Sequence, residues 1–257
     1  MQKLLHAINL GDRYEVNARL LPAMVAVLPI TTLALGLDLH SGHSIRAIGI
    51  GTGLEAVLAV LFSKLGHALG RNLENKCKAR WGGLPTTSWL MPEDNSHSEQ
   101  QKQIWRQAIS KLSGLNFDSL IGSGDLDELR RALDDAVSTV RNKIRADKRA
   151  ELLRQHNIYY GFARNMAGLA SSATLLSLLA SIVAGVAAYK NFAPVALPAI
   201  EVLFFVIAFG FLIQGTQYVC NCADRYAELF LVTATAIADS KIGSRKKMEA
   251  PPLKRDD

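Results

Sequence analysis

Long apolar runs dominate the pattern of hydrophobic and polar positions in this chain. Residues 166–189 contain no charged side chain, and a second run over 195–219 has Glu201 as its only charge. A hydrocarbon core is about 30 Å thick and a helix rises about 1.5 Å per residue, so each run is long enough to cross a membrane. The two runs, separated by residues 190–194, therefore predict a transmembrane helical hairpin. The alternative is a pair of buried helices in a large soluble protein.

Two further apolar runs precede this hairpin. Residues 20–37 carry no charge, and Pro29 in the middle of this run predicts a kinked helix. Residues 47–65 form the return helix of a first hairpin in this interpretation. This run is the weakest of the four, because Glu55 lies near its middle and a charged side chain is costly inside a membrane.

These runs predict an all-α integral membrane protein with four transmembrane helices and helical cytoplasmic extensions that form a stalk domain. The domains expected are an N-terminal interfacial helix with hairpin 1 (1–66), a cytoplasmic helical domain (67–164), hairpin 2 (165–219), and a cytoplasmic helix with a charged, disordered tail (220–257). No proline occurs between Pro92 and Pro194. One helix could therefore run from Asp125 into the third span as a single stalk.

The distribution of basic residues predicts the orientation of the spans. Residues 64–164 hold 17 of the 29 Lys and Arg residues, whereas the two short loops hold only Arg46 and Lys190. Cytoplasmic segments next to spans are enriched in Lys and Arg. We therefore expect both termini and the central segment in the cytoplasm, with the two short loops on the outer side.

Composition argues against several classes of protein. The chain is 49% hydrophobic and has a net charge of +6, which does not fit a disordered protein. Its three cysteines provide neither a disulfide framework nor a zinc motif. The sequence contains no phosphate-binding loop and no hydrolase or metalloprotease motif. We therefore expect no enzyme activity, no cofactor and no metal site.

The central segment shows local signals for helices. Ser98 followed by Gln101 has the spacing of a capping box, and Gly114 is a helix stop. Asp125 with Glu128 begins a second helix in the same manner. The apolar residues of this second helix recur at spacings of three and four, which suits helix pairing or self-association; the oligomer seam candidates are Leu126, Leu129, Leu133, Val140 and Ile144.

Two glutamates are candidates for an ion pathway. Glu55 lies within a predicted span, where acidic residues usually face a bundle interior or water. It either lines a pore or is paired with Arg46 or protonated. Glu201 lies only a few residues into its span, so an interfacial position is the alternative to a role in the pore. If both faced a symmetry axis, they would form acidic rings of the kind that select cations.

The segment from Trp81 to Trp89 is the best candidate for ligand recognition. It combines two tryptophans, hydroxyl groups and adjacent basic residues, which are suited to stacking a base and holding a phosphate. The residues concerned are Lys78, Arg80, Trp81, Thr86, Thr87 and Trp89. The alternative is a turn anchored by aromatic residues that docks the domain on the membrane surface.

Residues 78–90, with the motif Trp-Gly-Gly-Leu-Pro-Thr-Thr, resemble a Trp-Gly-Gly-x-Pro-Thr-Thr stretch in small bacterial membrane proteins, some of them encoded near anti-phage defence genes. The arrangement of spans around a cytoplasmic helical domain is similar to that of the membrane effector of the Hailong defence system. This resemblance implies an oligomeric, channel-forming or membrane-disrupting effector in the bacterial inner membrane. It also implies gating by a nucleotide or oligonucleotide and a partner signalling enzyme. The competing hypotheses are a membrane-anchored adaptor and a small transporter.

Overall fold

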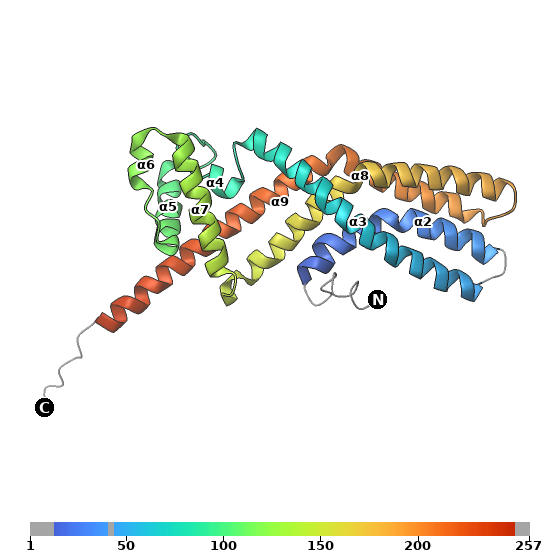
Figure 1. Cartoon of the computed structure of the whole chain (residues 1–257), viewed down its shortest axis with the longest axis horizontal. Coiled ribbons are helices and arrows are strands. Elements are labelled where there is room, and N and C mark those ends of the chain that lie inside the picture. The colour runs from blue at the N-terminus through green and yellow to red at the C-terminus, as the bar shows by residue number, and fades with distance from the viewer. Residues whose placement is uncertain (1–12, 41–43, 250–257) are drawn as a thin grey trace, which may run out of the picture. The chain divides into compact units, whose positions relative to one another are not determined.

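A computed structural model describes residues 13–40 and 44–249 of the chain. Within these ranges, the side chains at positions 39, 44–52, 54, 80, 123 and 241–249 are not described. Every regular element of the described residues is helical (Figure 1). The elements are η1 (Glu15–Leu20), α2 (Leu21–His40), α3 (Ser44–Trp81), α4 (Pro85–Ser88), α5 (Glu99–Ser113), α6 (Asp118–Ser123), α7 (Leu126–Ile144), η2 (Lys148–Ala150), α8 (Glu151–Tyr189) and α9 (Ala196–Glu249).

The chain forms two compact units. The first, which we call the bundle unit, consists of residues 1–77 and 157–222, and the second, the helical domain, consists of residues 78–156 and 223–257. Helices α3, α8 and α9 each have residues in both units. The all-helical class expected from the sequence is confirmed for the described residues.

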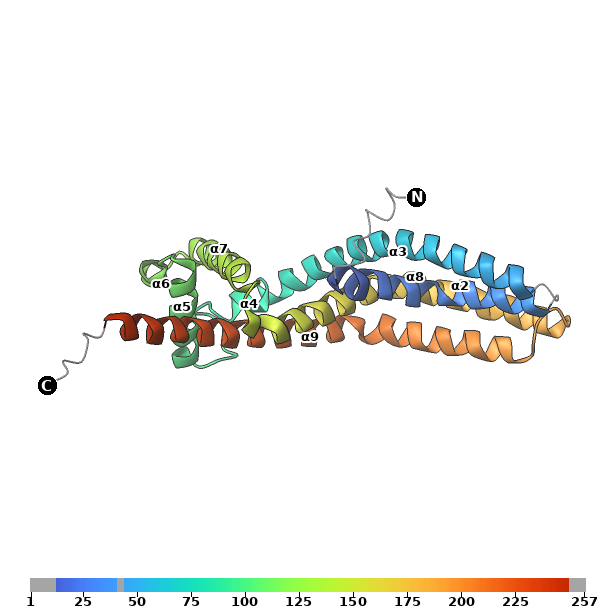
Figure 2. The ribbon, with the colours of Figure 1, turned by 90° about the horizontal axis from the view of Figure 1, so that it is seen from below.

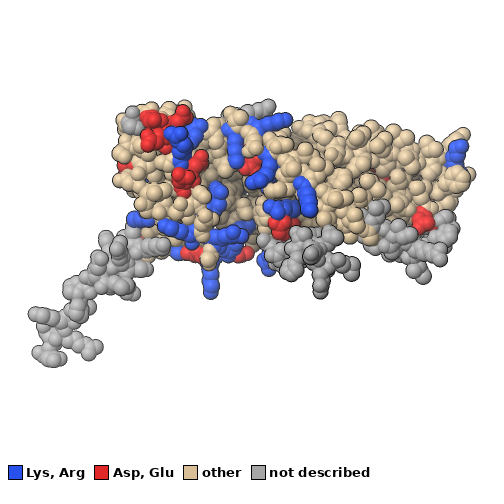
Figure 3. Space-filling model, viewed as in Figure 1, with Lys and Arg blue, Asp and Glu red and all other residues tan. Residues whose placement is uncertain are grey.

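The bundle unit contains helices that are long and apolar enough to cross a membrane. Three such segments are present among the described residues: Glu15–Asp38, Lys148–Tyr189 and Ala196–Ser240. Helices α2, α3, α8 and α9 lie side by side along this unit (Figures 1 and 2). Their outward surface is rich in exposed Leu, Ile, Val and Phe side chains, and one face of the bundle is largely free of charged residues (Figure 3). Such a surface suits a lipid environment.

The fourth expected span, residues 47–65, is not among these three segments. Residues 47–65 lie within α3 and contain Glu55. Most side chains in the first turns of α3 are not described. The four-span arrangement therefore stays a prediction. Over residues 13–40 and 44–249, the structure establishes a helical protein with three candidate membrane-spanning helices.

The interior of the bundle unit is made mainly of small residues. Ala23, Ala26, Leu169, Ala173 and Ala208 form one buried cluster. A second cluster of Ala184, Ala187, Ala193 and Leu197 packs against Leu33 and Leu37 of α2. Because alanine side chains are short, they let helix backbones approach closely, as is common between helices in membranes.

Two chain segments far apart in the sequence meet at one end of the bundle unit. The Nε2 atom of His40, at the end of α2, lies 2.9 Å from the carbonyl oxygen of Asn191, in the turn between α8 and α9. A Cβ on Gly36 would lie 2.6 Å from Leu197. The end of α2 and the turn between α8 and α9 therefore lie close together.

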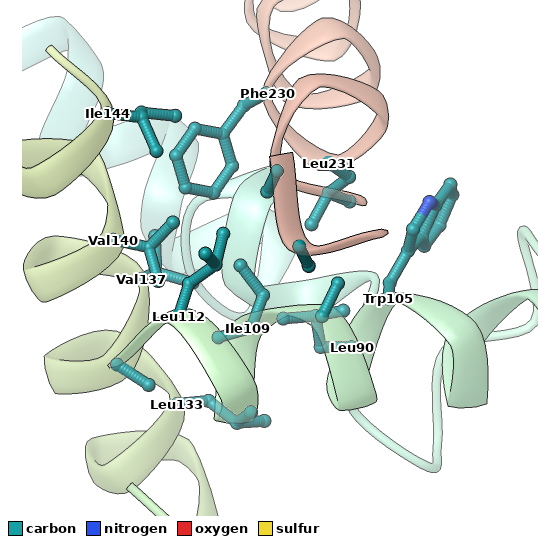
Figure 4. Packing of buried hydrophobic residues seen from close by; sticks show 14 of the residues in the cluster. Leu90, Trp105, Ile109, Leu112, Leu133, Val137, Val140, Ile144, Phe230 and Leu231 are labelled. Atoms are coloured by element: carbon teal, nitrogen blue, oxygen red, sulfur yellow. The ribbon is translucent and has the colours of Figure 1, made fainter. Parts of the chain in front are cut away.

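The helical domain has a core of its own. Helices α4, α5 and α6 each contact α7, and the side chains of Phe230 and Leu231 from α9 enter the same cluster (Figure 4). The buried residues include Leu90, Ile109 and Leu133. The contribution of α9 to this core was not expected, because residues 220–257 were expected to be a separate extension.

One expectation for the helices is wrong. A single stalk does not run from Asp125 into the third span, because α7 ends at Ile144 and α8 begins at Glu151. Asp147 caps the intervening turn by accepting a hydrogen bond from the backbone nitrogen of Arg149, and Arg154 donates to the backbone oxygens of Arg145 and Asp147. Helix α9 continues to Glu249 and residues 250–257 lie outside the described part of the chain, so the expected charged, disordered tail stays a prediction.

Candidate functional site

A carboxyl group lies in the interior of the bundle unit. Glu201, in the first turns of α9, has no exposed surface, and its Oε1 atom is 2.6 Å from the Oγ1 atom of Thr32 in α2. Its other oxygen, Oε2, has no hydrogen-bond partner among the described atoms. The side chain therefore faces the protein interior, and its depth in a membrane stays a prediction.

The local structure of α2 explains the polar groups beside Glu201. Thr32 Oγ1 also lies 2.9 Å from the carbonyl oxygen of Leu28 and 3.2 Å from that of Pro29. Thr31 donates to the same Leu28 oxygen and is almost fully buried. Threonines in helices commonly bond to carbonyls three or four residues earlier, as Thr31 and Thr32 do here. The two threonines were visible in the sequence, but their burial was not.

Glu55, the other ion-pathway candidate, is half-buried in α3. Its suggested partner Arg46 lies among the residues whose side chains are not described. No contact between Glu55 and Glu201 is present among the described side chains, so a shared acidic site stays a prediction.

A second polar cluster joins α3 and α8 and was missed by sequence reasoning. Arg164 Nη1 lies 2.5 Å from Glu74 Oε2, and both side chains are nearly buried. The neighbouring Asn165 donates from Nδ2 to the carbonyl oxygen of Ala18 at 2.6 Å. A signal was present in the sequence, because Arg164 is the last charged residue before the apolar run of residues 166–189, but nothing in the sequence identified Glu74 as its partner.

Most of the proposed recognition segment is packed into the helical domain. Thr86 and Thr87 are buried at 2% and 1% exposure, and Thr87 donates a hydrogen bond of 2.6 Å to Asp134 of α7. Trp89 lies against His97 and Trp105, with ring centroids 4.5 and 6.3 Å away. These contacts hold α4 on the domain core, and they leave the two threonine hydroxyls away from solvent.

The remaining residues of this segment are less enclosed. Lys78 and Trp81 are half-buried, and the side chain of Arg80 is not described. Gly82, which has a positive φ of 67°, offers its carbonyl oxygen to Arg130. Gly82 thus lies against Arg130 of α7, and the role of Lys78, Arg80 and Trp81 in binding a ligand stays a prediction.

A shallow pocket of about 390 Å³ lies elsewhere on the helical domain. It is lined by Glu99, Gln103, Arg106, Gln107, Asp118 and Ile121. Arg106 is 4% exposed and donates to Leu90 and Glu99, while its Nη2 atom has no partner among the described atoms. The pocket thus combines hydrogen-bond donors with two carboxylates, so it suits a ligand that carries both donor and acceptor groups better than a bare phosphate.

Buried cations shape the loop beside this pocket. Lys102, which is 3% exposed, donates to the backbone oxygens of Met91, Pro92 and Asp94. It also pairs with Glu99, and the hydrogen bonds from Lys102 and then Arg106 lower the pKa of that carboxyl below its ordinary value. Burial of a lysine is tolerated because its charge is paired and its donors are used.

The candidate oligomer seam is used inside the chain. Leu129, Leu133, Val140 and Ile144 are buried in the core of the helical domain, and only Leu126 is exposed, at 43%. The sequence suggested either helix pairing or self-association for these residues. Within this structure, the four buried residues pair α7 with other helices of the same domain. They leave no continuous apolar stripe on α7 for a second copy.

Together, these features define an all-helical protein with candidate membrane-spanning helices and a packed helical domain. Among the described residues, no group of His, Cys, Asp or Glu side chains has the arrangement of a metal site. Comparison with known protein families, curated proteins and solved structures finds no match.

Proposed function

We propose that this chain is an oligomeric effector of the bacterial inner membrane that changes membrane permeability in response to a ligand bound by its helical domain. The ligand class is a nucleotide or oligonucleotide, delivered by a partner signalling enzyme in anti-phage defence. Both termini and the helical domain face the cytoplasm. This proposal rests on the resemblance of residues 78–90 and on the structural argument below.

One observation supports the gating step. Helix α9 carries Glu201 within the apolar bundle and, further along the same helix, Phe230 and Leu231 of the helical-domain core. A rearrangement of that core would act on the helix that holds a buried acidic group in the bundle. A ligand shifts the equilibrium between two conformations only if its interactions with the protein differ between them. The proposal places this difference at the contacts of Phe230 and Leu231 in the helical-domain core.

The proposal predicts that an intact α9 is required for the response. Asn221 is exposed and lies at the boundary of the two units, so Asn221→Pro removes one backbone hydrogen bond and bends the helix at a cost of about 3 kcal/mol. Asn221→Ala is the matched control, because it also loses the bond from Gln217 but keeps the helix.

The assay measures ion flux into liposomes that contain the purified full-length protein, with and without a panel of nucleotides and short oligonucleotides. We expect a ligand-dependent flux with the wild type and Asn221→Ala, and its loss with Asn221→Pro. Circular dichroism and ligand binding verify that both variants are folded. If no compound produces flux although the protein binds a cytoplasmic partner, the membrane-anchored adaptor is the better description. Substrate uptake without permeability would favour the transporter.

A further inference from the structure

The Glu201 site has an excess of oxygen atoms over available protons. Thr32 has one hydroxyl proton, but its Oγ1 atom lies within hydrogen-bond distance of Glu201 Oε1, at 2.6 Å, and of the carbonyl oxygens of Leu28 and Pro29, at 2.9 and 3.2 Å. If Glu201 were ionised, this single proton would be the one donor to its buried carboxylate among the described atoms. Its second oxygen, Oε2, would then carry charge with no partner among the described atoms.

None of the described basic side chains is paired with Glu201. Between Arg164 and Lys190, α8 and the turn after it contain no Asp, Glu, Lys, Arg or His, and α9 contains no other charged residue before Asp224. In α2 and in α3 up to residue 65, the remaining Asp, Glu, Lys, Arg and His residues are Asp38, His40, Arg46, Glu55 and Lys64; the side chain of Arg46 is not described.

An unpaired charge at this position would be expensive. Burial of an ionised carboxylate that lacks a counter-charge is strongly unfavourable, because the charge loses its hydration and gains no compensating partner. A protonated carboxyl group removes the charge and supplies the missing donor. Its O–H then donates to Thr32 Oγ1, and the Thr32 hydroxyl donates to Leu28, so that each proton has one acceptor.

A metal cation is a poorer occupant of this site. Divalent cations bound through oxygen take about six or more ligands, whereas the described side chains near Glu201 Oε1 supply only Thr32. The separation of 2.6 Å between Glu201 Oε1 and Thr32 Oγ1 is that of an O–H···O hydrogen bond. The geometry is therefore satisfied by a proton alone.

We propose that Glu201 is a proton-binding site at neutral pH, and that its proton links α2 of the first hairpin to α9 of the second through Thr32. Removal of the proton leaves a buried carboxylate, so the contact between α2 and α9 weakens as the pH rises. This site goes beyond the proposed function, because it is present whether or not the protein conducts ions.

Infrared spectroscopy of the full-length protein in lipid tests the proposal directly. The difference between the spectra of the wild type and Glu201→Gln at neutral pH should contain the C=O stretch of a protonated carboxylic acid. This band should disappear in strongly alkaline buffer. Thr32→Val should shift the band to higher frequency, because the carboxyl group then loses its hydrogen-bonded partner. Glu55→Gln is the matched control, since it also neutralises an acidic residue of an apolar segment but should keep the Glu201 band.

Glutamine mimics the protonated side chain in size and donor capacity, so Glu201→Gln is expected to fold, which circular dichroism verifies. Its thermal stability should be insensitive to alkaline pH where the wild type loses stability. Absence of the carboxylic acid band in the wild type would overturn the proposal, as would a band that is present but unchanged by Thr32→Val. A stability profile of Glu201→Gln that follows the wild type at high pH would also contradict it.

Discussion

A close backbone approach between α3 and α8 in the bundle unit provides a quantitative test of the packing. Helices α3 and α8 meet at Gly70 and Gly168, where a Cβ added to Gly168 would lie 2.5 Å from the backbone nitrogen of Gly70 and 2.9 Å from its Cα. Both atoms belong to the main chain, so no side chain can rotate away to relieve the clash. The helices must move apart if position 168 carries any larger residue.

The expected magnitude of Gly168→Ala follows from two opposing effects. Alanine is favoured over glycine inside a helix by about 1 kcal/mol, whereas overpacking a close contact costs about 1–3 kcal/mol. Separating α3 from α8 also strains the adjacent ion pair of Arg164 with Glu74 and the hydrogen bond from Asn165. We therefore expect a net destabilisation of about 1–2 kcal/mol.

Gly185 on the same helix supplies the control, because a Cβ there would meet nothing within 4 Å. Gly185→Ala should leave stability unchanged or slightly higher. The assay is thermal unfolding of the detergent-solubilised protein followed by circular dichroism, with the two variants measured side by side. A Gly168→Ala variant as stable as Gly185→Ala would refute the close approach of α3 and α8.

Two further predictions concern ion pairs. Glu74→Gln leaves the nearly buried Arg164 without its counter-charge, and we expect a loss of about 3–5 kcal/mol in unfolding experiments; a loss below about 1 kcal/mol would show that the pair is solvated. Glu99 has a lowered pKa, because hydrogen bonds from Lys102 and then Arg106 favour its charged form. The stabilisation by ionised Glu99 is fully present above the ordinary glutamate pKa of about 4.3 and is lost as the pH falls through the lowered pKa. The wild type should therefore lose more stability in acid than Glu99→Gln. Parallel melting curves of both proteins across acidic pH would contradict this reasoning.

Local signals in the sequence predicted the helices of the central segment well. Ser98 caps α5 by accepting a hydrogen bond from Gln101, and the helix stops at Gly114, whose φ is 81°. Asp125 caps α7 through the backbone nitrogen of Glu128. Each of these features depends on residues a few positions apart, so the sequence contains the whole interaction.

Long-range partners could not be predicted in the same way. The apolar stripe of α7 predicted that Leu133 would be buried, but its spacing could not show that part of the covering surface comes from α9, about 100 residues later. The burial of Glu201 depends on Thr32, which is 169 positions away. The break between α7 and α8 also escaped prediction, because it depends on side chains that bond to the backbone and not on proline or glycine.

The two buried polar sites of the bundle unit differ in the cost of breaking them, and this difference predicts where the bundle opens. Separating Arg164 from Glu74 exposes two charges to an apolar interior, at a cost of about 3–5 kcal/mol. The hydrogen bond between protonated Glu201 and Thr32 joins two neutral groups, and such a bond in a membrane contributes about 0.6 kcal/mol. Around Glu201, the neighbouring helix contacts involve mainly small residues such as Ala184 and Ala193. We therefore expect that alkaline pH lengthens distances between spin labels on α2 and α9 near Glu201 while labels on α3 and α8 near Glu74 keep their separation. Equal lengthening at both places would mean that the charged pair does not hold its end of the bundle closed.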